Sequence, residues 1–218
     1  SGRKSQRGKA DATQQSVPST PPSRRTPLPQ HALTAGLGAV CHFGLRDAVK
    51  QEVGHICSFL RRHRSELTFR VLCRIVNHVS SWGSGNTTKA IALPLLDNMR
   101  SEICQRLQST RLMQGSEAEE AEVTASDLCL VAHAYTSTSM PARSSAELFN
   151  ELQQSLPDVA LLHLSAGELA NLANAFSKQN QAAANGYLHL YSSIGKQLAM
   201  MGKEVDLRSS CVALNAFA

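Results

Sequence analysis

The sequence LSAGELANLANAF, from Leu164 to Phe176, predicts an amphipathic helix with a defined start. Ser165 stands just before the helical pattern and Glu168 follows three residues later, which is the reciprocal arrangement of a capping box. Leu164 occupies the position of a hydrophobic staple, immediately before the cap. Apolar residues then recur at three- and four-residue steps and form one stripe: Leu169, Leu172, Ala173 and Phe176.

This pattern occurs four times in the chain. A shift of 41 residues towards the N-terminus gives VTASDLCLVAHAY at residues 123–135, with Thr124 at the cap position. A shift of 41 residues in the other direction gives VDLRSSCVALNAF at residues 205–217, with Asp206 as the cap. A looser copy, LTFRVLCRIVNHV, covers residues 67–79. Four copies in order indicate a repeat protein.

A second apolar pattern, with the spacing i, i+1, i+4 and i+8, follows three of these helices. Its members are Leu95, Leu96, Met99 and Ile103 in one copy, Leu148, Phe149, Leu152 and Leu156 in the next, and Leu190, Tyr191, Ile194 and Leu198 in the third. Since both helices of the pair repeat, we predict an all-α solenoid of antiparallel helix-pair repeats with a period of about 41 residues.

The chain divides into three predicted parts. Residues 1–32 form an irregular basic extension rich in proline and serine, which is too polar to build a core. Residues 33–66 form a degenerate first helical hairpin, whose second helix runs from about Leu45 to His63. Residues 67–218 form the repeat array, with three hairpins and the first helix of a fourth. That last helix would leave apolar surface uncovered, so we expect further repeats or a neighbouring protein there.

Charge is distributed unevenly along the chain. Residues 1–30 carry six Lys or Arg and one Asp, residues 45–111 carry eleven basic and five acidic residues, and residues 112–218 carry five basic and eleven acidic residues. A polyanion is the partner expected for the basic part, and protein or solvent for the acidic part. No apolar run approaches the length of about 20 residues that crosses a bilayer, so we expect no membrane contact.

The cysteines show no spacing suited to a zinc site. Cys73, Cys129 and Cys211 occupy the same position in three copies of the repeat. We therefore expect them to be reduced thiols in the core, which favours a reducing compartment.

The pattern L-[ST]-x-x-[DE]-L-x-x-[LV]-A-[NH]-A-[FY] resembles the helical-hairpin repeats of organellar RNA-binding proteins. These are the FAST-kinase-like and RAP-domain proteins and their octotricopeptide and heptatricopeptide relatives. Leu164 to Phe176 and Thr124 to Tyr135 carry the resemblance most clearly, and it covers roughly residues 67–218. It implies work on organellar RNA: transcript stabilisation, transcript processing, or a structural place in a mitochondrial ribosome.

One column of the repeat is polar in all four copies and would lie on the surface formed by the first helices. Its members are Asn77, His133, Asn174 and Asn215. Asn and His side chains can hydrogen-bond the edges of bases in single-stranded RNA. The alternative is a stripe that solvates the helices or joins neighbouring repeats. Leu130 and Val212 interrupt the polar surface, which argues against a base-by-base code.

Arginine side chains are the predicted phosphate contacts, because their guanidinium groups pair with phosphate oxygens and give affinity without sequence preference. A solvated charged face is the alternative. The predicted contacts in the repeat region are Arg61, Arg62, Arg64, Arg70 and Arg74. In the extension the predicted contacts include two lysines beside the arginines: Arg3, Lys4, Arg7, Lys9, Arg24 and Arg25.

Sequence features of catalysis are weak. His42, His55 and His63 are isolated, and residues 83–85 lack the spacing of a nucleophile elbow or a P-loop. Cys41 and His42, with His55 and Cys57, match no familiar metal site. We expect no enzyme activity and no cofactor.

The sequence therefore predicts a non-catalytic RNA-binding protein, most specifically a structural subunit of a mitochondrial ribosome that contacts ribosomal RNA. The resemblance implies the mitochondrial matrix, with a plastid as the alternative, and the serine- and arginine-rich, acid-poor extension is also what organelle transit peptides look like. Two other functions stay open: a free factor for the stability or processing of organellar transcripts, and a protein–protein scaffold in a mitochondrial complex.

Overall fold

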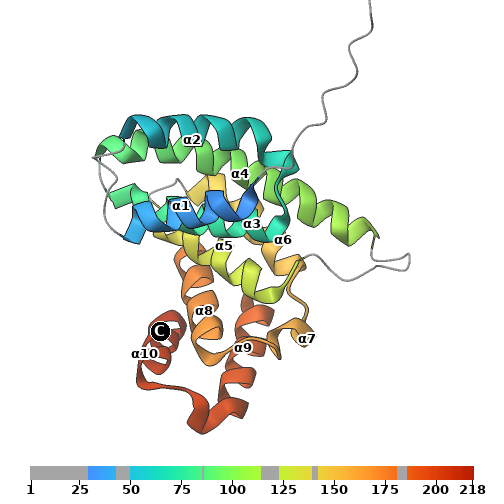
Figure 1. The fold of residues 1–218 in the computed structure, drawn as a ribbon. Coiled ribbons are helices and arrows are strands. Elements are labelled where there is room, and N and C mark those ends of the chain that lie inside the picture. Colours follow the sequence, from blue (N-terminus) through green and yellow to red (C-terminus); the bar gives the residue numbers. More distant parts are fainter. Residues whose placement is uncertain (1–28, 43–49, 85, 114–122, 139–141, 181–185) are drawn as a thin grey trace, which may run out of the picture.

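The computed structural model describes residues 29–42, 50–84, 86–113, 123–138, 142–180 and 186–218, and the regular elements in these ranges are all helices. Figure 1 shows their arrangement. The α-helices are α1 (Gln30–His42), α2 (Lys50–His63), α3 (Phe69–Ser80), α4 (Asn86–Met113), α5 (Ala125–Ser137), α6 (Ala142–Gln154), α7 (Asp158–Leu161), α8 (Ala166–Asn180), α9 (Leu188–Met201) and α10 (Leu207–Phe217). The predicted all-α class is confirmed for this described part of the chain.

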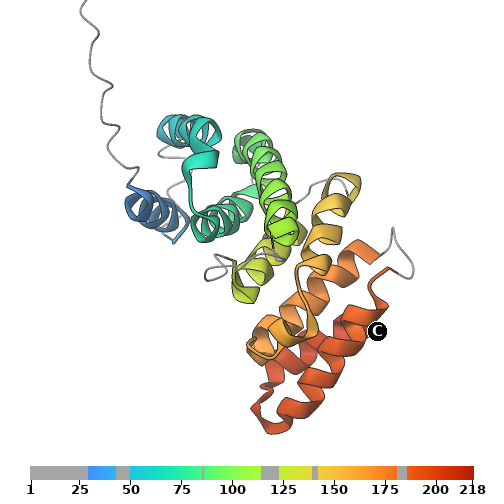
Figure 2. The ribbon, with the colours of Figure 1, turned by 90° about the vertical axis from the view of Figure 1, so that its right-hand side faces the viewer.

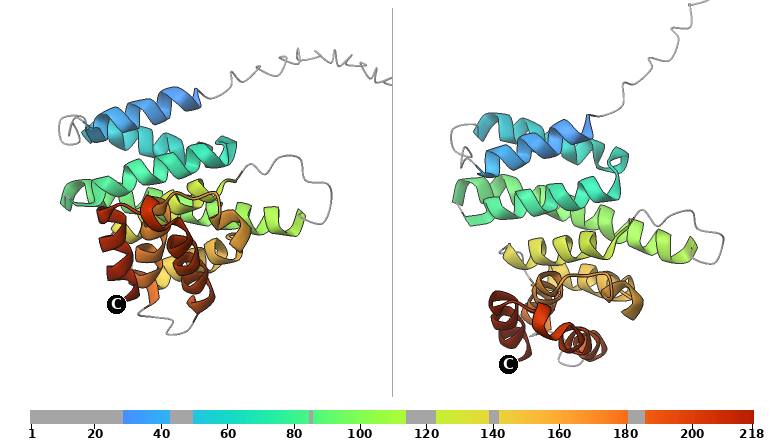
Figure 3. Two further views of the ribbon diagram at one scale, coloured as in Figure 1. Left: turned by 90° about the horizontal axis from the view of Figure 1, so that it is seen from below. Right: turned by 60° about the horizontal axis from the view of Figure 1, so that its bottom comes forward.

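The helices α1, α3, α5, α8 and α10 pack against one another in chain order. The right-hand view of Figure 3 shows this order from the blue helix α1 at the top to the red helix α10 at the bottom. Four of these five are the helices that begin the repeat copies. Successive copies of the first-helix pattern are therefore neighbours in space.

The remaining helices form a second row beside the first. In this row α2 packs on α4, α4 packs on α6, and the short α7 packs on α9. The two rows also contact each other, since α3 contacts α4, α5 contacts α6, and α8 contacts α9. Figure 2, where several helices are seen almost end-on, shows the two rows.

The core lies between the two rows and consists of the apolar stripes that the sequence shows. All eight residues of the first two second-helix sets are buried, as are Leu190 and Ile194 of the third. Aromatic side chains link the rows: the rings of Phe149 and Phe176 meet edge to face at a centroid distance of 5.0 Å, and those of Phe176 and Tyr187 at 4.9 Å. Such burial is worth about 1.5–3 kcal/mol for each large side chain.

The predicted helix caps are present at three of the four first helices. The Ser165 backbone N–H donates to Glu168 Oε2 over 2.8 Å, and the Glu168 N–H donates back to Ser165 Oγ over 3.3 Å. Thr124 Oγ1 accepts from the Asp127 N–H over 3.2 Å, and Asp206 Oδ1 accepts from the Ser209 N–H over 2.6 Å. These bonds satisfy backbone donors that have no partner inside the helix.

Each of these caps also contacts the preceding first helix. Arg70, the second residue of α3, forms an ion pair with Asp127, the third residue of α5, with 3.7 Å between Nε and Oδ2. Ser126, the second residue of α5, faces the carboxyl group of Glu168, the third residue of α8, and lowers the pKa of that carboxyl. Gly167, the second residue of α8, lies against Ser209, the third residue of α10, so that a Cβ on Gly167 would be 3.6 Å from Ser209 Oγ. We call this recurring second-to-third-residue contact the junction.

One predicted boundary of the first hairpin differs from the structure, and another lies outside the described residues. The helix α1 begins at Gln30, so Gln30 to Ala32 belong to a helix and not to the irregular extension. Pro29 directly precedes it, and its carbonyl accepts the first helical hydrogen bond, from the Leu33 N–H, over 3.1 Å. The second helix of the hairpin is described from Lys50 to His63. Its predicted start, at about Leu45, lies outside the described residues and stays a prediction.

The cysteine prediction is correct at two positions and wrong at one. Cys73 and Cys129 are buried, at 0% and 5% exposure, in the interfaces that α3 and α5 form with the next first helix. Cys211 is exposed, because no described helix covers the corresponding face of α10. Among the described helices, none is both long and apolar enough to cross a membrane.

Candidate nucleic-acid interface

The predicted phosphate contacts of the repeat region lie on two rows of helices. Arg61 and Arg62 are exposed in the last turn of α2, where a positive charge also compensates the partial negative charge of the helix end. Arg70 and Arg74 are exposed on α3, in the other row. The structure therefore separates the predicted basic group into Arg61, Arg62 and Arg64 at the end of α2 and just after it, and the pair Arg70 and Arg74 on α3.

Two of the predicted arginines already have anionic partners. Arg64 Nε lies 3.5 Å from Glu102 Oε2, and its Nη1 donates to the Arg61 carbonyl over 2.8 Å. Arg70 pairs with Asp127 at the junction between α3 and α5. Within the described residues, Arg61, Arg62 and Arg74 form no ion pair, so these three are the cations most available to a phosphate.

Three further arginines of the basic region hold the fold together. Arg106 donates to the carbonyl oxygens of Leu67 over 2.7 Å, Ser65 over 3.1 Å and Arg64 over 3.3 Å, and its Nε donates to Glu102 over 2.9 Å. Arg100 bridges Asp97 and Glu147, at 3.1 and 3.0 Å. Arg111 pairs with Glu151 at 3.1 Å. The basic excess of residues 45–111 therefore serves structure as well as surface charge.

The predicted extension residues Arg3, Lys4, Arg7, Lys9, Arg24 and Arg25 lie outside the described residues.

The polar column crosses four packed helices, with Asn77 on α3, His133 on α5, Asn174 on α8 and Asn215 on α10. His133 and Asn215 are exposed, while Asn77 and Asn174 are half-buried. Partial burial of the ring, and then the positive charge of Lys178 on α8, lower the pKa of His133. His133 is therefore largely neutral at pH 7, and its ring offers both a donor and an acceptor.

Burial also acts on His78, one turn after Arg74 on α3. It lowers the pKa of the imidazole, and the neighbouring positive charge of Arg74 lowers the pKa further. The ring lies against α1, where a Cβ on Gly38 would be 3.3 Å from the His78 ring. His78 thus belongs to the contact between α1 and α3, next to the exposed guanidinium of Arg74.

A groove of about 620 Å³ joins the last two members of the column. Asn174 and Asn215 line it together with Lys178, Tyr191 and Phe217. The rings of Tyr191 and Phe217 meet at a centroid distance of 5.8 Å and an angle of 69°. The groove thus combines two amides, one ammonium group and two aromatic rings, which are the groups that hold an unstacked base and its phosphate.

Tyr191 is the feature of this groove that the sequence did not reveal. Sequence reasoning assigned it to the apolar stripe of the second helix, and its ring does pack partly against the core. Its Oη is buried and has no hydrogen-bond partner among the described residues. Burial, and then the neighbouring Tyr187, raise the pKa of Tyr191 to about 12, so the hydroxyl is a neutral donor.

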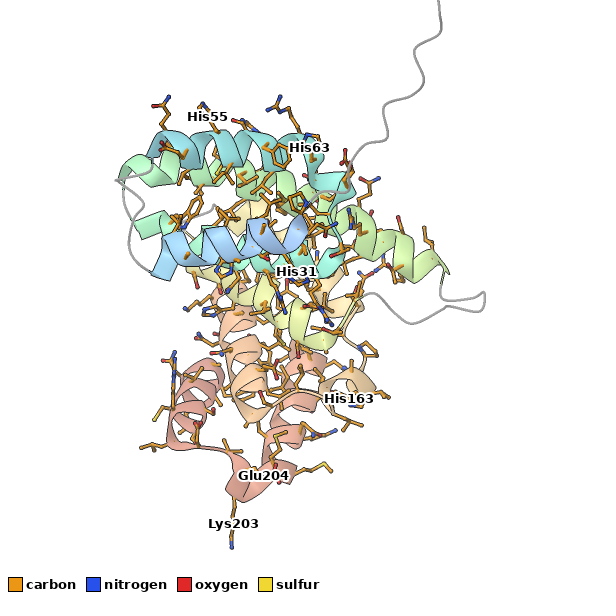
Figure 4. The ribbon with its side chains drawn as sticks, viewed as in Figure 1. His31, His55, His63, His163, Lys203 and Glu204 are labelled. Atoms are coloured by element: carbon orange, nitrogen blue, oxygen red, sulfur yellow. The ribbon has the colours of Figure 1, made fainter. Side chains whose placement is uncertain are left out.

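The histidines lie apart from one another. Figure 4 labels His55 and His63 on α2, His31 on α1 and His163 beside α7, at separate places on the surface. His63 Nδ1 is 3.1 Å from Glu66 Oε1. The centroid of the His63 ring is 4.5 Å from that of the Phe59 ring, and the two rings are tilted by 33°. Within the described residues, no three His, Cys, Asp or Glu side chains are grouped to hold a metal ion. The side chains of Cys41 and His42 lie outside the described residues.

Comparison of the chain with protein-family models, with curated proteins and with solved structures gave no match.

Proposed function

We propose that this chain is a non-catalytic RNA-binding protein built as a solenoid of antiparallel helix pairs with a period of about 41 residues. The junction supports the repeat, because the second residue of one first helix contacts the third residue of the next in three successive pairs. The observation that carries RNA binding is the polar column on α3, α5, α8 and α10, which has exposed cations beside it on α3 and α8.

RNA is the polyanion that fits this surface best. Arg74 provides an exposed guanidinium group for the phosphate backbone beside the column, and Arg61 and Arg62 provide two more on α2, in the second row. Amides, a neutral imidazole and the aromatic groove provide partners for unpaired bases. A double helix offers its bases only inside grooves, whereas a single strand can lay them along the column.

We test RNA binding by fluorescence anisotropy with a labelled single-stranded RNA of mixed sequence, at several salt concentrations. In Arg61→Gln/Arg62→Gln, affinity should fall, and the slope of log K against log salt should flatten by about 1.4, at about 0.7 for each lost phosphate contact. The matched control is Lys196→Gln/Lys203→Gln, which removes two exposed cations from the acidic half. Unchanged binding after replacement of Arg61, Arg62, Arg64, Arg70 and Arg74 together, in a chain that is still helical, would overturn the proposal.

More specifically, we propose that the protein is a structural subunit of a mitochondrial ribosome. The repeat resemblance and the division into a basic and an acidic half support this placement. The test is sedimentation of the tagged chain with ribosomal particles at moderate salt, followed by identification of crosslinked RNA. Crosslinks to ribosomal RNA in the particle fraction support the placement. Crosslinks to transcripts in the light fractions would indicate a free factor, and protein crosslinks without RNA would indicate a scaffold.

A further inference from the structure

The surface formed by the first helices carries positive charge on both sides of α5 but none on α5 itself. Arg74 on α3 and Lys178 on α8 are exposed. The helix α5, which packs between α3 and α8, contains neither lysine nor arginine. The right-hand view of Figure 3 shows α5 in this central position. A phosphate backbone that crosses the three helices therefore meets a cation on the first and the third of them, and none on the second.

His133 is the one residue of α5 that becomes a cation when it gains a proton. It is exposed and belongs to the polar column, between Asn77 on α3 and Asn174 on α8. Arg74 lies one turn before Asn77, and Lys178 lies one turn after Asn174. In the register of the repeat, His133 therefore occupies the middle of a line that runs from Arg74 to Lys178 across three packed helices.

The surroundings keep this imidazole neutral in the free chain. Partial burial of the ring lowers the pKa of His133, and the positive charge of Lys178 lowers the pKa further. Since both neighbouring helices present cations, an anion placed between them is what would favour the protonated ring.

The carboxylates on the elements packed around α5, and that of α5 itself, are already in ion pairs or caps. They are Asp127 with Arg70, Glu168 with Ser165, Glu147 with Arg100, and Glu151 with Arg111. The short helix η2 (Ser81–Ser84) has no titratable side chain, and the side chain of Arg143 on α6 lies outside the described residues. Within the described residues, the charge that acts on His133 is thus the positive charge of Lys178.

We propose that His133 takes up a proton from solvent when an RNA backbone crosses α5, so that RNA binds more tightly as the pH falls from 7.5 to 5.5. A phosphodiester held over α5 supplies the negative charge that an imidazolium lacks in the free chain, and the ring N–H groups donate to its oxygens. No covalent bond changes. The inference rests on the RNA-binding function proposed above, and it makes the contact at α5 one with phosphate.

The size of the effect follows from proton linkage. Because a bound phosphate favours the charged ring, the pKa of His133 is higher in the complex than in the free chain. A rise of about one in that pKa corresponds to about a tenfold gain in affinity between a pH above both values and a pH below both. Protonation stabilises the complex below the pKa of the bound state, and this contribution is lost as the pH rises through that pKa.

The test is fluorescence anisotropy of the full chain with a labelled oligouridylate, at pH 7.5 and pH 5.5 and constant salt. Uracil neither gains nor loses a proton in this range, and an RNA without a terminal phosphate monoester is used, so the RNA itself does not titrate. We expect the unchanged chain to gain at least about threefold more affinity on acidification than His133→Gln. The matched control is His163→Gln, which replaces an exposed histidine beside α7 and should keep the full gain.

A permanent charge at the same position provides a second measurement. At pH 7.5, His133→Lys should bind about as tightly as the unchanged chain binds at pH 5.5. The slope of its log K against log salt should be steeper than that of the unchanged chain at pH 7.5 by about 0.7, the value for one added phosphate contact. A residue that only supports the fold would give neither change.

His78 is the other imidazole beside this surface, next to Arg74 on α3. His78→Gln is therefore measured in the same way, with circular dichroism at both pH values to verify equal helix content. It should keep the part of the gain that His133→Gln loses. A gain that disappears in His78→Gln and persists in His133→Gln would assign the proton to α3 and overturn the proposal.

Two further results would count against the proposal. Equal gains in the unchanged chain and in His133→Gln, with RNA still bound, would leave the RNA-binding function standing and remove the proton from α5. An unaltered affinity and salt dependence in His133→Lys would show that no phosphate lies at α5. A chain that binds no RNA at either pH would instead contradict the proposed function itself, and this inference with it.

Discussion

The side chain of Gln30, at the start of α1, caps the start of α3. Its Oε1 accepts a hydrogen bond from the Thr68 backbone N–H over 3.1 Å, and its Nε2 donates to the Glu66 carbonyl over 3.3 Å. At the start of α8 the corresponding N–H is that of Ser165, and it donates to the carboxylate of Glu168, which belongs to α8 itself. The equivalent residue of α3 is Val71, which has no acceptor. A residue 38 positions away in the chain therefore supplies the acceptor that α3 itself lacks.

Replacement of Gln30 by Ala should destabilise the N-terminal part of the fold. It leaves the Thr68 N–H without its acceptor, and the loss of such a cap costs about 1 kcal/mol. Urea denaturation followed by circular dichroism measures the change. The control is Gln51→Ala, because Gln51 is an exposed glutamine on α2. Equal midpoints for the two variants would contradict this role for Gln30.

Arg106 should be the arginine whose loss costs most stability. Arg106→Met leaves the carbonyl oxygens of Leu67, Ser65 and Arg64 without this donor, and Glu102 without its closest cation. The free energy of unfolding should fall by about 2 kcal/mol or more. Arg106→Lys should restore only part of it, because an ammonium group cannot reproduce the planar fork of a guanidinium. Arg62→Met, on the exposed end of α2, should change stability by less than about 0.5 kcal/mol.

Glu168 should make stability depend on pH in the acid range. Burial alone raises the pKa of this carboxyl, but the hydrogen bonds from Ser165, together with the effect of Ser126, outweigh it and hold the pKa below its ordinary value of 4.5. A carboxyl with a lower pKa in the folded state contributes stability at pH values above 4.5, and this contribution is lost as the pH falls through the folded pKa. Urea denaturation between pH 7 and pH 3 should therefore show a smaller loss of stability for Glu168→Gln than for the unchanged chain.

The thiols should differ sharply in reactivity. Burial raises the pKa of Cys129 to about 12, with the nearby Glu168 adding to the effect, and burial raises the pKa of Cys73 further still. Cys211 is exposed. Since the thiolate is the reactive form, a thiol reagent at pH 8 should modify Cys211 quickly in the folded chain. The side chain of Cys41 lies outside the described residues, so all chains carry Cys41→Ser, and in that background Cys211→Ser should remove the fast phase. Cys129→Ser should leave it in place, and a fast phase that disappears in this variant would contradict the assignment.

Periodicity in the sequence was sufficient to predict the first helices α3, α5, α8 and α10 and three of their four caps. Leu164 to Phe176 predicted both the buried stripe and the Ser165–Glu168 cap, because each depends on residues close together in the chain. The shift of 41 residues then located Thr124 and Asp206 as caps. The burial of Cys73 and Cys129 followed from the same register.

The failures arose where a residue's surroundings come from distant parts of the chain. Cys211 has the register of a buried thiol, but its exposure depends on what packs against α10. In the sequence, Arg106 and Arg61 are both arginines of the basic region and cannot be told apart. Only the carbonyl groups that surround Arg106 in the fold show that it stabilises the structure. The groove at Tyr191 depends on how α8, α9 and α10 meet. Local pattern cannot show such relations between helices.

The pair of Arg70 and Asp127 has a consequence for any anion that reaches α3. The guanidinium is 56% exposed and open to solvent, while the Asp127 side chain is only 7% exposed and also supports the start of α5. A phosphate that binds Arg70 must compete with the Asp127 carboxylate. Because that carboxylate is largely buried, contacts with water would not replace the lost ion pair. Anion binding at Arg70 should therefore destabilise the start of α5, and a stable start of α5 should oppose anion binding there. Arg74, one turn further along α3, forms no ion pair with an acidic side chain among the described residues.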